Sequence, residues 1–276
     1  MSEETFLAPC TKTTAERSVF QSTGILKVII QSAHIDSGVR WCLQPPSPFV
    51  VVQGGFVFQR TKTRDHTYDP SWLEETLFLL VSSADENVKL KVYDAHRHWK
   101  NRLLGVAVLR GGTLDTQLAL LRRGQKVGDL SCSAFYYPAE AADDGSETGI
   151  ARLTLHRVEG LAQPPVANGC NAFGLPATKL RALVRLDWDE RPIFATKKVV
   201  LKDGVAAWEL AHEFLCRKSS TCKVNIEVWN ETRGEQVGLV HIGLMEMVEA
   251  ERASWPLAGT SVATVKASAE WRRVTL

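Results

Sequence analysis

A short polar segment, residues 94–102, concentrates side chains that can bind an anionic surface. It reads Asp-Ala-His-Arg-His-Trp-Lys-Asn-Arg and places three permanent cations, Arg97, Lys100 and Arg102, around Trp99. Cations bind phosphate groups, and a tryptophan ring suits the headgroup region of a bilayer. The segment therefore predicts a loop that docks on an anionic membrane.

A second segment, residues 39–43, has the same character, with Arg40 and Trp41 followed by Leu43. Each Lys or Arg near an anionic lipid surface contributes about 1 kcal/mol, so the four cations of the two segments could supply about 4 kcal/mol. That is enough for weak docking and too little for stable anchoring. The alternative is that Trp41 or Trp99 folds back onto its own domain.

Two titratable histidines, His96 and His98, lie within the first of these segments. A metal site needs a third ligand, and the sequence offers none nearby. Protonation near pH 6.5 would instead add positive charge at the lipid-facing loop. We therefore expect a pH response rather than metal binding there.

No familiar catalytic motif occurs in the 276 residues. G-x-S-x-G, the P-loop and H-E-x-x-H are absent from the sequence, and the six cysteines include no C-x-x-C pair. We therefore expect no enzyme activity, no zinc site and no other cofactor. The N-terminus has no secretory signal, so the cysteines are expected to be reduced thiols in the cytoplasm.

Short strands separated by turns must position these segments. Apolar runs that alternate with polar residues at regular spacing predict an all-β fold of antiparallel β-sandwiches. The expected strands are 24–30, 48–53, 56–63, 72–81, 89–94, 104–109 and 128–137, then 149–155, 179–186, 193–201, 208–215, 223–229, 237–244 and 262–271. Apolar spacing also favours short helices at 113–122 and 244–253.

The second half of the chain repeats the first. Val-Tyr-Asp at 92–94 recurs as Val-Trp-Asn at 228–230, and Trp72 recurs as Trp208. A repeat of this length indicates a duplicated domain. The sequence therefore predicts a disordered segment at 1–21, a first domain at 22–139, an acidic linker at 140–148 and a second domain at 149–276.

The formal net charge of +2 divides unevenly along the chain. Residues 1–139 and residues 149–276 carry +3 each, and the linker carries −4. Charges this small do not indicate nucleic-acid binding. No run of about 18 apolar residues occurs, so no spanning helix is expected.

The motifs resemble those of C2 domains, β-sandwich modules that dock on phospholipid membranes. The first half has Ser-Pro-Phe-Val at 47–50 where the family has Asp-Pro-Tyr-Val, and Asp-Pro-Ser-Trp at 69–72 for the family's Asn-Pro-x-Trp. The second half keeps Thr-Lys-Lys at 196–198 but lacks Asn-Pro before its Trp. The resemblance implies two C2-type antiparallel β-sandwiches in tandem.

More narrowly, the pair resembles the C-terminal part of tricalbins, fungal relatives of extended synaptotagmins. Phe-Tyr-Tyr-Pro at 135–138 resembles the strand that closes one of their C2 domains. The resemblance implies a peripheral module of a tether between endoplasmic reticulum and plasma membrane, whose partner is phosphatidylserine or phosphoinositides. The anchor and lipid-transfer domain of that family are missing, so the chain is expected to be a fragment or a stand-alone module. The alternative is a calcium-silent scaffold that binds proteins.

Calcium-binding C2 domains place about five aspartates on two loops at one end of the sandwich, because calcium takes six to eight oxygen ligands. By resemblance, the matching positions of the first half carry one acid and one permanent cation, and those of the second half carry one acid. The positions are Trp41, Ser47, Asp94, His96 and Arg102, then Asn230, Thr232 and Glu235. Calcium binding is therefore not expected.

A basic sheet face is expected on the second half. Alternation along the strands turns five cations outward, namely Lys179, Arg181, Arg185, Lys198 and Lys202. By resemblance to other C2 domains, such a face binds phosphoinositide headgroups; the alternative is a merely solvated face. In the first half, Arg60, Lys62 and Arg64 form a similar row. Strand alternation places Phe56 and Phe58 on the same face as this row, so whether the three cations point away from the core stays open.

The proline-rich segment 164–176 is expected to be a long loop. Phe173 and Leu175 could form an apolar tip that inserts into a bilayer. Packing of this tip back onto the domain is the alternative.

Overall fold

Alternating apolar residues build the first domain as an antiparallel β-sandwich. The structure is a computed structural model, and it describes residues 21–276 except 38–43, 55–56, 97–99, 111–115, 142–146, 162–177, 190 and 251–253. The strands of this domain are β1 (Gly24–Ile35), β2 (Pro48–Gly54), β3 (Val57–Arg60), β4 (Ser71–Val81), β5 (Val88–Asp94), β6 (Arg102–Leu109), β7 (Thr116–Arg122) and β8 (Gln125–Ala141).

The strands run in the order β4-β1-β8-β7-β6-β5-β2-β3, and the pairs between them are antiparallel. Inward side chains such as Val28, Val50, Leu79 and Leu90 are fully buried between the two layers. In β5 burial alternates strictly, so Lys89 and Lys91 point out of the core. The sheet composed of β2, β3 and β5 therefore presents one polar face.

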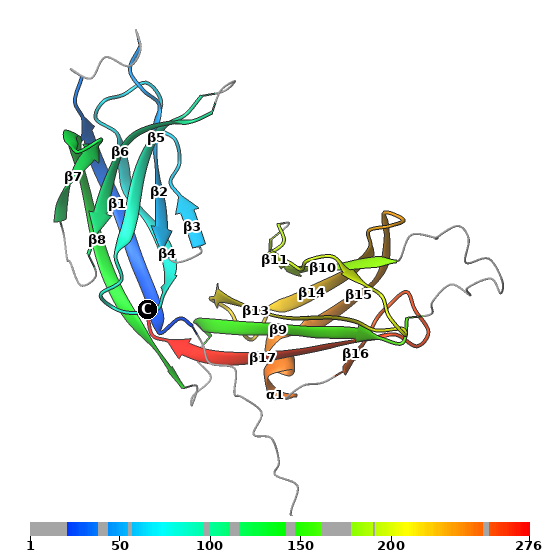
Figure 1. The fold of residues 1–276 in the computed structure, drawn as a ribbon. Helices are drawn as coiled ribbons and strands as arrows, with labels where there is room; N and C mark the ends of the chain where they lie inside the picture. Colours follow the sequence, from blue (N-terminus) through cyan, green and yellow to red (C-terminus); the bar gives the residue numbers. More distant parts are fainter. Residues whose placement is uncertain are drawn as a thin grey trace, which may run out of the picture.

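The second domain has the same architecture. Its elements are β9 (Gly149–Glu159), β10 (Lys179–Leu186), β11 (Phe194–Ala195), β12 (Val199–Val200), β13 (Ala206–Cys216), β14 (Lys223–Asn230), β15 (Glu235–Gly243), α1 (Leu244–Glu249), β16 (Ser254–Pro256) and β17 (Thr264–Val274). One layer is ordered β11-β10-β14-β15 and the other contains β13-β9-β17. The all-β expectation is confirmed, with two sandwiches in tandem (Figure 1).

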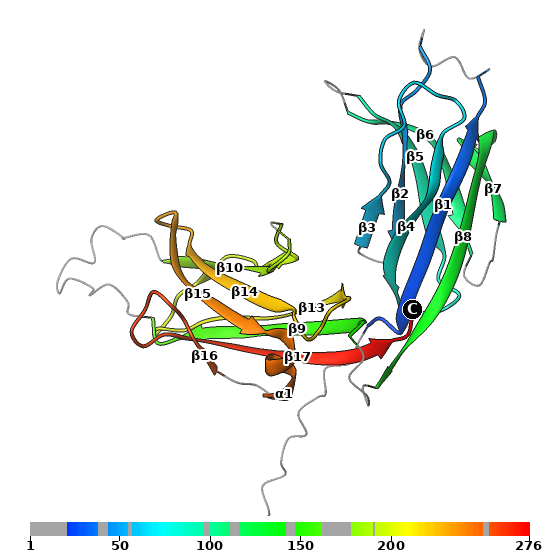
Figure 2. The same ribbon diagram turned by 180° about the vertical axis from the view of Figure 1, so that it is seen from behind.

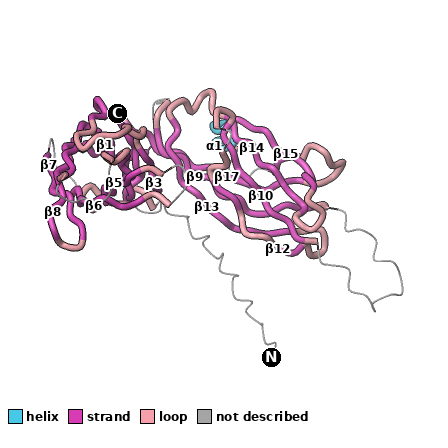
Figure 3. Tube along the Cα trace, turned by 90° about the horizontal axis from the view of Figure 1, so that it is seen from above, coloured by secondary structure: helices cyan, strands magenta, loops and turns pink. Residues whose placement is uncertain are grey.

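One of the two expected helices is wrong. Residues 116–122 form strand β7, in which only every second apolar side chain is shielded and Leu120 is the buried one. Leu114, Leu118 and Leu121 have helical spacing, but the ladder with β8, from Thr116–Cys132 to Arg122–Gln125, overrides that pattern. The other helix exists as α1, which is the one α-helix in the described part of the chain (Figure 3).

Two side-chain hydrogen bonds recur in both domains and confirm the internal repeat. The hydroxyl of Thr61 accepts the backbone N–H of Val50 at 2.9 Å, and that of Thr196 accepts the N–H of Ala182 at 2.9 Å. The indole of Trp72 donates to the carbonyl of Lys62 at 2.8 Å, and Trp208 donates to the carbonyl of Lys197 at 3.1 Å. These bonds align the two domains residue by residue, so Arg60 corresponds to Ala195.

An apolar cluster joins the domains. Ile25 of the first domain packs with Ile150 and Val274 of the second, and all three are buried. β8 continues through Glu140 and Ala141, the first two residues of the expected linker, and pairs there with β17. The guanidinium of Arg217 lies over the ring of Phe78, 4.2 Å from its centroid. The domains therefore share a packed junction as well as a covalent connection.

The long axes of the two sandwiches meet at an angle at this junction (Figures 1 and 2). The β5–β6 turn of the first domain and the β14–β15 turn of the second both lie at the ends remote from the junction. The turn between β10 and β11 lies at the opposite end of the second domain, on the side of the first domain. Each domain thus has one free end and one joined end.

Candidate functional site

Asp94, the one acid at the expected calcium positions of the first domain, is enclosed by its own neighbours. It ends β5 beside Arg102, which begins β6. Arg102 Nη2 lies 3.0 Å from Asp94 Oδ2, and His96 Nε2 lies 3.3 Å from the same oxygen. The backbone N–H of Ser47 donates to Oδ1 at 2.9 Å, and the Asp94 side chain is only 6% exposed.

Both oxygens of Asp94 are therefore engaged by groups of the protein, and one partner is a permanent cation. A charge-assisted bond of this kind is strong because the guanidinium needs no proton uptake to hold it. Within the described residues, no group of three or more His, Cys, Asp or Glu side chains is placed to hold a metal ion. The geometry thus gives Asp94 a structural role in closing the loop end.

Several of the predicted docking residues cannot be placed. Lys100 is described and exposed, immediately before β6. Arg40, Trp41, Leu43, Arg97, Trp99, Phe173 and Leu175 lie outside the described residues, as does His98. The predictions made for them stay predictions.

The matching end of the second domain uses its polar groups within a turn. Asn230 ends β14, and its side-chain oxygen accepts the backbone N–H groups of Thr232 at 3.0 Å and Arg233 at 3.2 Å. The hydroxyl of Thr232 accepts the N–H of Lys179 at 3.0 Å, and Glu235 pairs with Arg233 at 3.4 Å. Each expected calcium position here therefore has a partner in the protein.

The basic face of the second domain exists, but carboxylates neutralise much of it. β10 buries Leu180, Ala182, Val184 and Leu186 and turns the intervening residues outward, as the alternation predicts. Arg181 lies 3.7 Å and Lys198 lies 2.7 Å from Glu231, and Arg185 lies 2.9 Å from Glu227.

The hydrogen bond from Lys198 is the main cause that lowers the pKa of Glu231, so this acid stays ionised. Lys179 and Lys202 are exposed. Of the five predicted cations, three are thus held in ion pairs that the sequence does not reveal.

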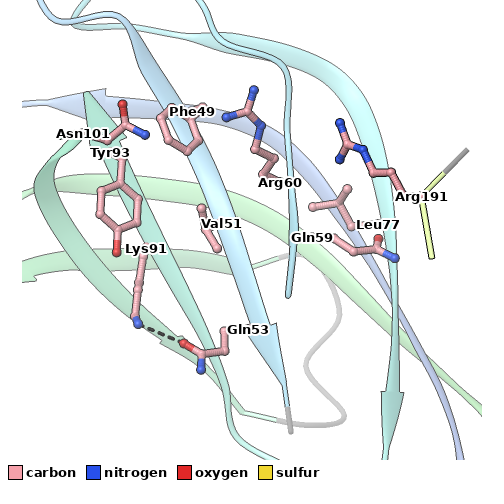
Figure 4. Close-up of a pocket in the computed structure, with 10 residues that line it drawn as sticks. All are labelled: Phe49, Val51, Gln53, Gln59, Arg60, Leu77, Lys91, Tyr93, Asn101 and Arg191. Carbon is pink, nitrogen blue, oxygen red and sulfur yellow. Dashed lines mark hydrogen bonds between the residues drawn. The ribbon is translucent and has the colours of Figure 1, made fainter. Parts of the chain in front are cut away.

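The corresponding face of the first domain is hollowed. A hollow of about 700 Å³ is lined by residues of β2, β3 and β5, with Leu77 of β4, Asn101 and Arg191 of the second domain. Among the described residues that line it, the cations are Arg60, Lys91 and Arg191, and none is acidic. Figure 4 shows Lys91 and Tyr93 on one side of β2 and Arg60 and Arg191 on the other.

Neutral groups hold two of these cations. The guanidinium of Arg60 lies 5.1 Å from the ring centroid of Phe49, which in turn stacks on Tyr93 with centroids 5.7 Å apart. The ammonium of Lys91 donates to Gln53 Oε1 at 2.9 Å.

The sequence leaves the direction of Arg60 open and misses Arg191. The alternation of β5 already signals an outward Lys91, but no local pattern places a second-domain residue beside it.

A hydroxyl–imidazole–carboxylate chain crosses three strands of the second domain. His156 Nε2 lies 3.0 Å from Ser268 Oγ, and His156 Nδ1 lies 2.7 Å from Glu209 Oε2. His156 occupies a β-bulge, where the register with β13 and with β17 shifts. At the matching bulge of the first domain, Gln31 Nε2 donates to Ser133 Oγ at 3.1 Å. A neutral amide thus makes the same cross-strand bond, which indicates a structural rather than a catalytic role.

Comparison with known proteins assigns this arrangement to a family. The C2 domain model matches residues 24–124 and 150–256, more than half of the sequence, so the chain belongs to the C2 domain family. Each match lies within one of the two sandwiches, the first ending before β8 and the second before β17. This is therefore a tandem C2 protein, as the resemblance of its motifs predicts.

Among characterised relatives, the chain is homologous to tricalbins of Saccharomyces cerevisiae. It is 23% identical to Tricalbin-1 over 79% of its length and 29% identical to Tricalbin-3 over 46%. It spans about a fifth of Tricalbin-1. The solved pair of C2 domains from Extended-Synaptotagmin 2 matches with a TM-score of 0.67, 14% identity and 99% coverage of both chains, which shows the shared fold.

Proposed function

We propose that this tandem module docks on anionic phospholipid membranes without calcium, as part of a tricalbin-like tether at contacts between endoplasmic reticulum and plasma membrane. The enclosure of Asp94 by Arg102, His96 and the Ser47 N–H is the observation that carries the proposal. Calcium-dependent domains need a divalent ion to neutralise carboxylates and to bridge to lipid. Here the guanidinium of Arg102 is bonded to Asp94, the one carboxylate at the expected calcium positions of the first domain.

Membrane contact is assigned to the free ends of the two domains and to their basic sheet faces. The first-domain end carries exposed Lys100, and the aromatic and basic segments 39–43 and 97–99 lie outside the described residues, so their part in docking stays a prediction. Phe173 and Leu175, the predicted docking residues of the second domain, precede β10 in the sequence and lie outside the described residues. Each cation near anionic lipid adds about 1 kcal/mol, so several are needed before ordering costs are offset.

The packed junction supports a tethering role. Because Ile25, Ile150 and Val274 are buried together, the two free ends are held apart instead of moving independently on a linker. Two weak docking ends joined through a packed junction raise each other's effective concentration at a surface.

A catalytic role is not proposed, since the Ser268–His156–Glu209 chain has a neutral counterpart in the first domain. Among the described residues, no helix is long and apolar enough to span a membrane.

Cosedimentation with vesicles tests the proposal. In chelator and low salt, we expect binding to phosphatidylserine vesicles and not to phosphatidylcholine vesicles, with affinity falling steeply as salt screens the charges. Lys100→Glu should weaken binding, whereas Lys218→Glu, an equally exposed lysine at the junction end, should not. Absence of vesicle binding in low salt would contradict the proposal and favour the protein-binding alternative.

A further inference from the structure

We propose that Cys216 and Cys222 are a redox-active pair, which a hydroperoxide converts to a reversible disulfide that cross-links the loop at the domain junction. Cys216 is the last residue of β13, and Cys222 directly precedes β14. The β13–β14 loop, residues 217–222, connects the two sheets of the second domain. This loop lies at the joined end of the domain, so its redox chemistry is independent of the proposed membrane docking.

The two thiols lie in contact inside the core of the second domain. They are 0% and 1% exposed, and the thiol of Cys222 donates a hydrogen bond to the sulfur of Cys216. Thiols in such contact need only a small approach to reach the S–S bond length of about 2 Å. Cys132, the third described cysteine, lies in the core of the first domain, so it has no described thiol beside it.

Backbone hydrogen bonds hold both cysteines in place. Cys216 pairs with Gly149 of β9. The N–H of Cys222 donates to the carbonyl of Lys218 at 3.0 Å, and the carbonyl of Cys222 accepts the N–H of Leu244 at 2.8 Å. Because the chain already keeps the two sulfurs together, forming the bond requires little further loss of chain freedom.

The two thiols differ in acidity. The sulfur of Cys216 accepts hydrogen bonds from the Cys222 thiol and from the backbone N–H of Lys218, and the first of these chiefly lowers the pKa of Cys216. The same bond chiefly raises the pKa of Cys222, because the donor has to keep its proton. Since the thiolate is the form that attacks a peroxide, Cys216 is the attacking thiol and Cys222 is the one that closes the disulfide.

The reaction balances with hydrogen peroxide as the oxidant. The sulfur of Cys216 attacks one peroxide oxygen, the O–O bond breaks, and the second oxygen leaves with the thiol proton as water. The sulfur of Cys222 then attacks the sulfenic acid of Cys216, the S–O bond breaks, and the hydroxyl leaves with the second thiol proton as water. Two thiols thus lose two electrons and two protons, and the peroxide is reduced to two waters. A dithiol reverses the reaction by exchange.

A second hollow gives a small oxidant a route toward the buried thiols. It has a volume of about 350 Å³ and lies against the chain next to both cysteines, lined by Trp188, Leu215, Arg217, Lys218 and Thr221. Hydrogen peroxide is little larger than water. A local opening of the β13–β14 loop therefore suffices to bring it from this hollow to the sulfur of Cys216.

The β13–β14 loop is also part of the contact between the domains. The N–H of Ser219 donates to the carbonyl of Glu147 at 2.9 Å, and the carbonyl of Arg217 accepts the hydroxyl of Thr148 at 3.3 Å. The guanidinium of Arg217 lies over the ring of Phe78 in the first domain. A disulfide closes a ring around this loop and restricts its opening. Oxidation should therefore stiffen the domain junction.

Tryptic peptide mapping of the full chain tests the pair. Trypsin cleaves after Arg217 and Lys218, so the reduced chain releases Cys216 in peptide 203–217 and Cys222 in peptide 219–223. The chain is treated with hydrogen peroxide at a dose that oxidises half of added glutathione, and the remaining thiols are then alkylated in denaturant. We expect the two peptides to be joined by a disulfide that dithiothreitol separates.

Cys132 is the control within the same molecule. Burial raises the pKa of its thiol to about 12, so it should remain reduced and be alkylated. Alkylation of both Cys216 and Cys222 after peroxide treatment would overturn the inference. So would oxidation of Cys132 to the same extent, because it would mean that the thiol pair has no special reactivity.

Two variants separate the roles of the thiols. Cys222→Ser keeps a hydrogen-bond donor beside Cys216 and removes the second thiol, so the sulfenic acid of Cys216 should accumulate and react with dimedone. Cys216→Val copies the first domain, in which Val81 faces Gly24 as Cys216 faces Gly149. It should give no dimedone adduct on Cys222. An adduct on Cys222 alone would reverse the assigned roles, and thermal unfolding checks that both variants remain folded.

Hydrogen exchange measured by mass spectrometry tests the effect on the junction. In the oxidised full chain, the amides of Ser219 and Cys222 should exchange about tenfold more slowly than in the reduced chain, because the ring restricts opening of the loop. The amide of Val28 in the core of the first domain is the control and should not change. Equal or faster exchange of the loop amides after oxidation would contradict a stiffened junction.

Discussion

On the outer sheet face of the first domain, Arg60 lies over the ring of Phe49 and Lys91 donates to the amide of Gln53. On the matching face of the second domain, Arg181 and Lys198 converge on Glu231. The backbones are equivalent, since the hydroxyls of Thr61 and Thr196 each accept a backbone N–H of the neighbouring strand. The difference lies in the partners of the cations, which are neutral in one domain and ionised in the other.

This difference teaches that the number of cations on a face is a poor guide to its charge. Exposed ion pairs contribute little to stability, in the range of about 0–1 kcal/mol each, so the pairs around Glu231 are not explained by folding alone. Their consequence is electrostatic, because they lower the positive potential of the second-domain face. The first-domain face keeps its potential and is the stronger candidate for an anion.

The largest expected effect is on the free energy of unfolding when one of the equivalent tryptophans, Trp72 or Trp208, is truncated. Trp72 is 2% exposed and bonds the carbonyl of Lys62, whereas Trp208 is half-buried with the equivalent bond. Trp72→Ala should cost about 3–5 kcal/mol, as for other buried aromatic truncations, and Trp208→Ala less. Urea unfolding followed by fluorescence of the remaining tryptophans measures both. Equal losses would contradict the difference in burial.

Exchanging the charges at the equivalent positions Lys91 and Glu227 tests directly whether the two sheet faces differ in membrane affinity. Lys91→Glu should lower affinity for anionic vesicles about 30-fold, because reversing one charge near the surface changes binding by about 2 kcal/mol. Glu227→Lys should raise affinity, since it adds a cation and removes the carboxylate that pairs with Arg185. Cosedimentation in chelator measures both variants. Opposite results, or no change in either, would mean that neither face meets the membrane.

A smaller effect is expected from neutralising the shared acid of the second domain. Glu231→Gln frees Arg181 and Lys198 and should raise vesicle affinity about fivefold, the effect of one charge near an anionic surface. The gain should vanish in high salt. Glu249→Gln, which removes an exposed acid at the end of α1, is the matched control. A gain in both variants would indicate a general charge effect without a contribution from this face.

The smallest effect is a pH response of opposite sign in the two domains. The hydrogen bond to Asp69 chiefly raises the pKa of His34 above its ordinary 6.5, and burial lowers the pKa of His212 below it. The contribution of His34 to stability is present below pH 6.5 and is lost as pH rises through its raised pKa. That of His212 is present above pH 6.5 and is lost as pH falls toward its lowered pKa.

Proton NMR titration of the imidazole signals measures both pKa values. The signal of His34 should titrate at higher pH than that of His212. Asp69→Asn should return His34 toward its ordinary pKa and leave His212 unchanged. If both residues titrate at one pH, the assigned causes are wrong.

Alternation made most of the fold predictable from the sequence. β10 begins and ends at the predicted residues, and the outward direction of its three cations is as expected. β7 was not predictable, because its leucines satisfy helical spacing and only pairing with β8 decides the matter. The site was predictable only in part. The ion pairs of Glu231 and the approach of Arg191 depend on strand register and on the domain junction, which no local pattern encodes.

The enclosure of Asp94 shows that calcium binding depends on the partners of each acid as well as on the number of acids at the calcium positions. A lone carboxylate could still recruit an ion together with lipid phosphate. Here Arg102 and the Ser47 N–H each use one of its oxygens, so an ion would have to displace a charge-assisted bond. The proposed calcium independence therefore rests on the partners of Asp94 as well as on the missing aspartates.

The most direct test of calcium-independent docking is one vesicle titration performed in chelator, in calcium and in magnesium, where magnesium is the control for screening. We predict binding to phosphatidylserine vesicles in chelator, and the same dissociation constant in calcium as in magnesium. Binding that appears only in calcium, and not in magnesium, would contradict the proposed role of Arg102 and the whole account of the docking end.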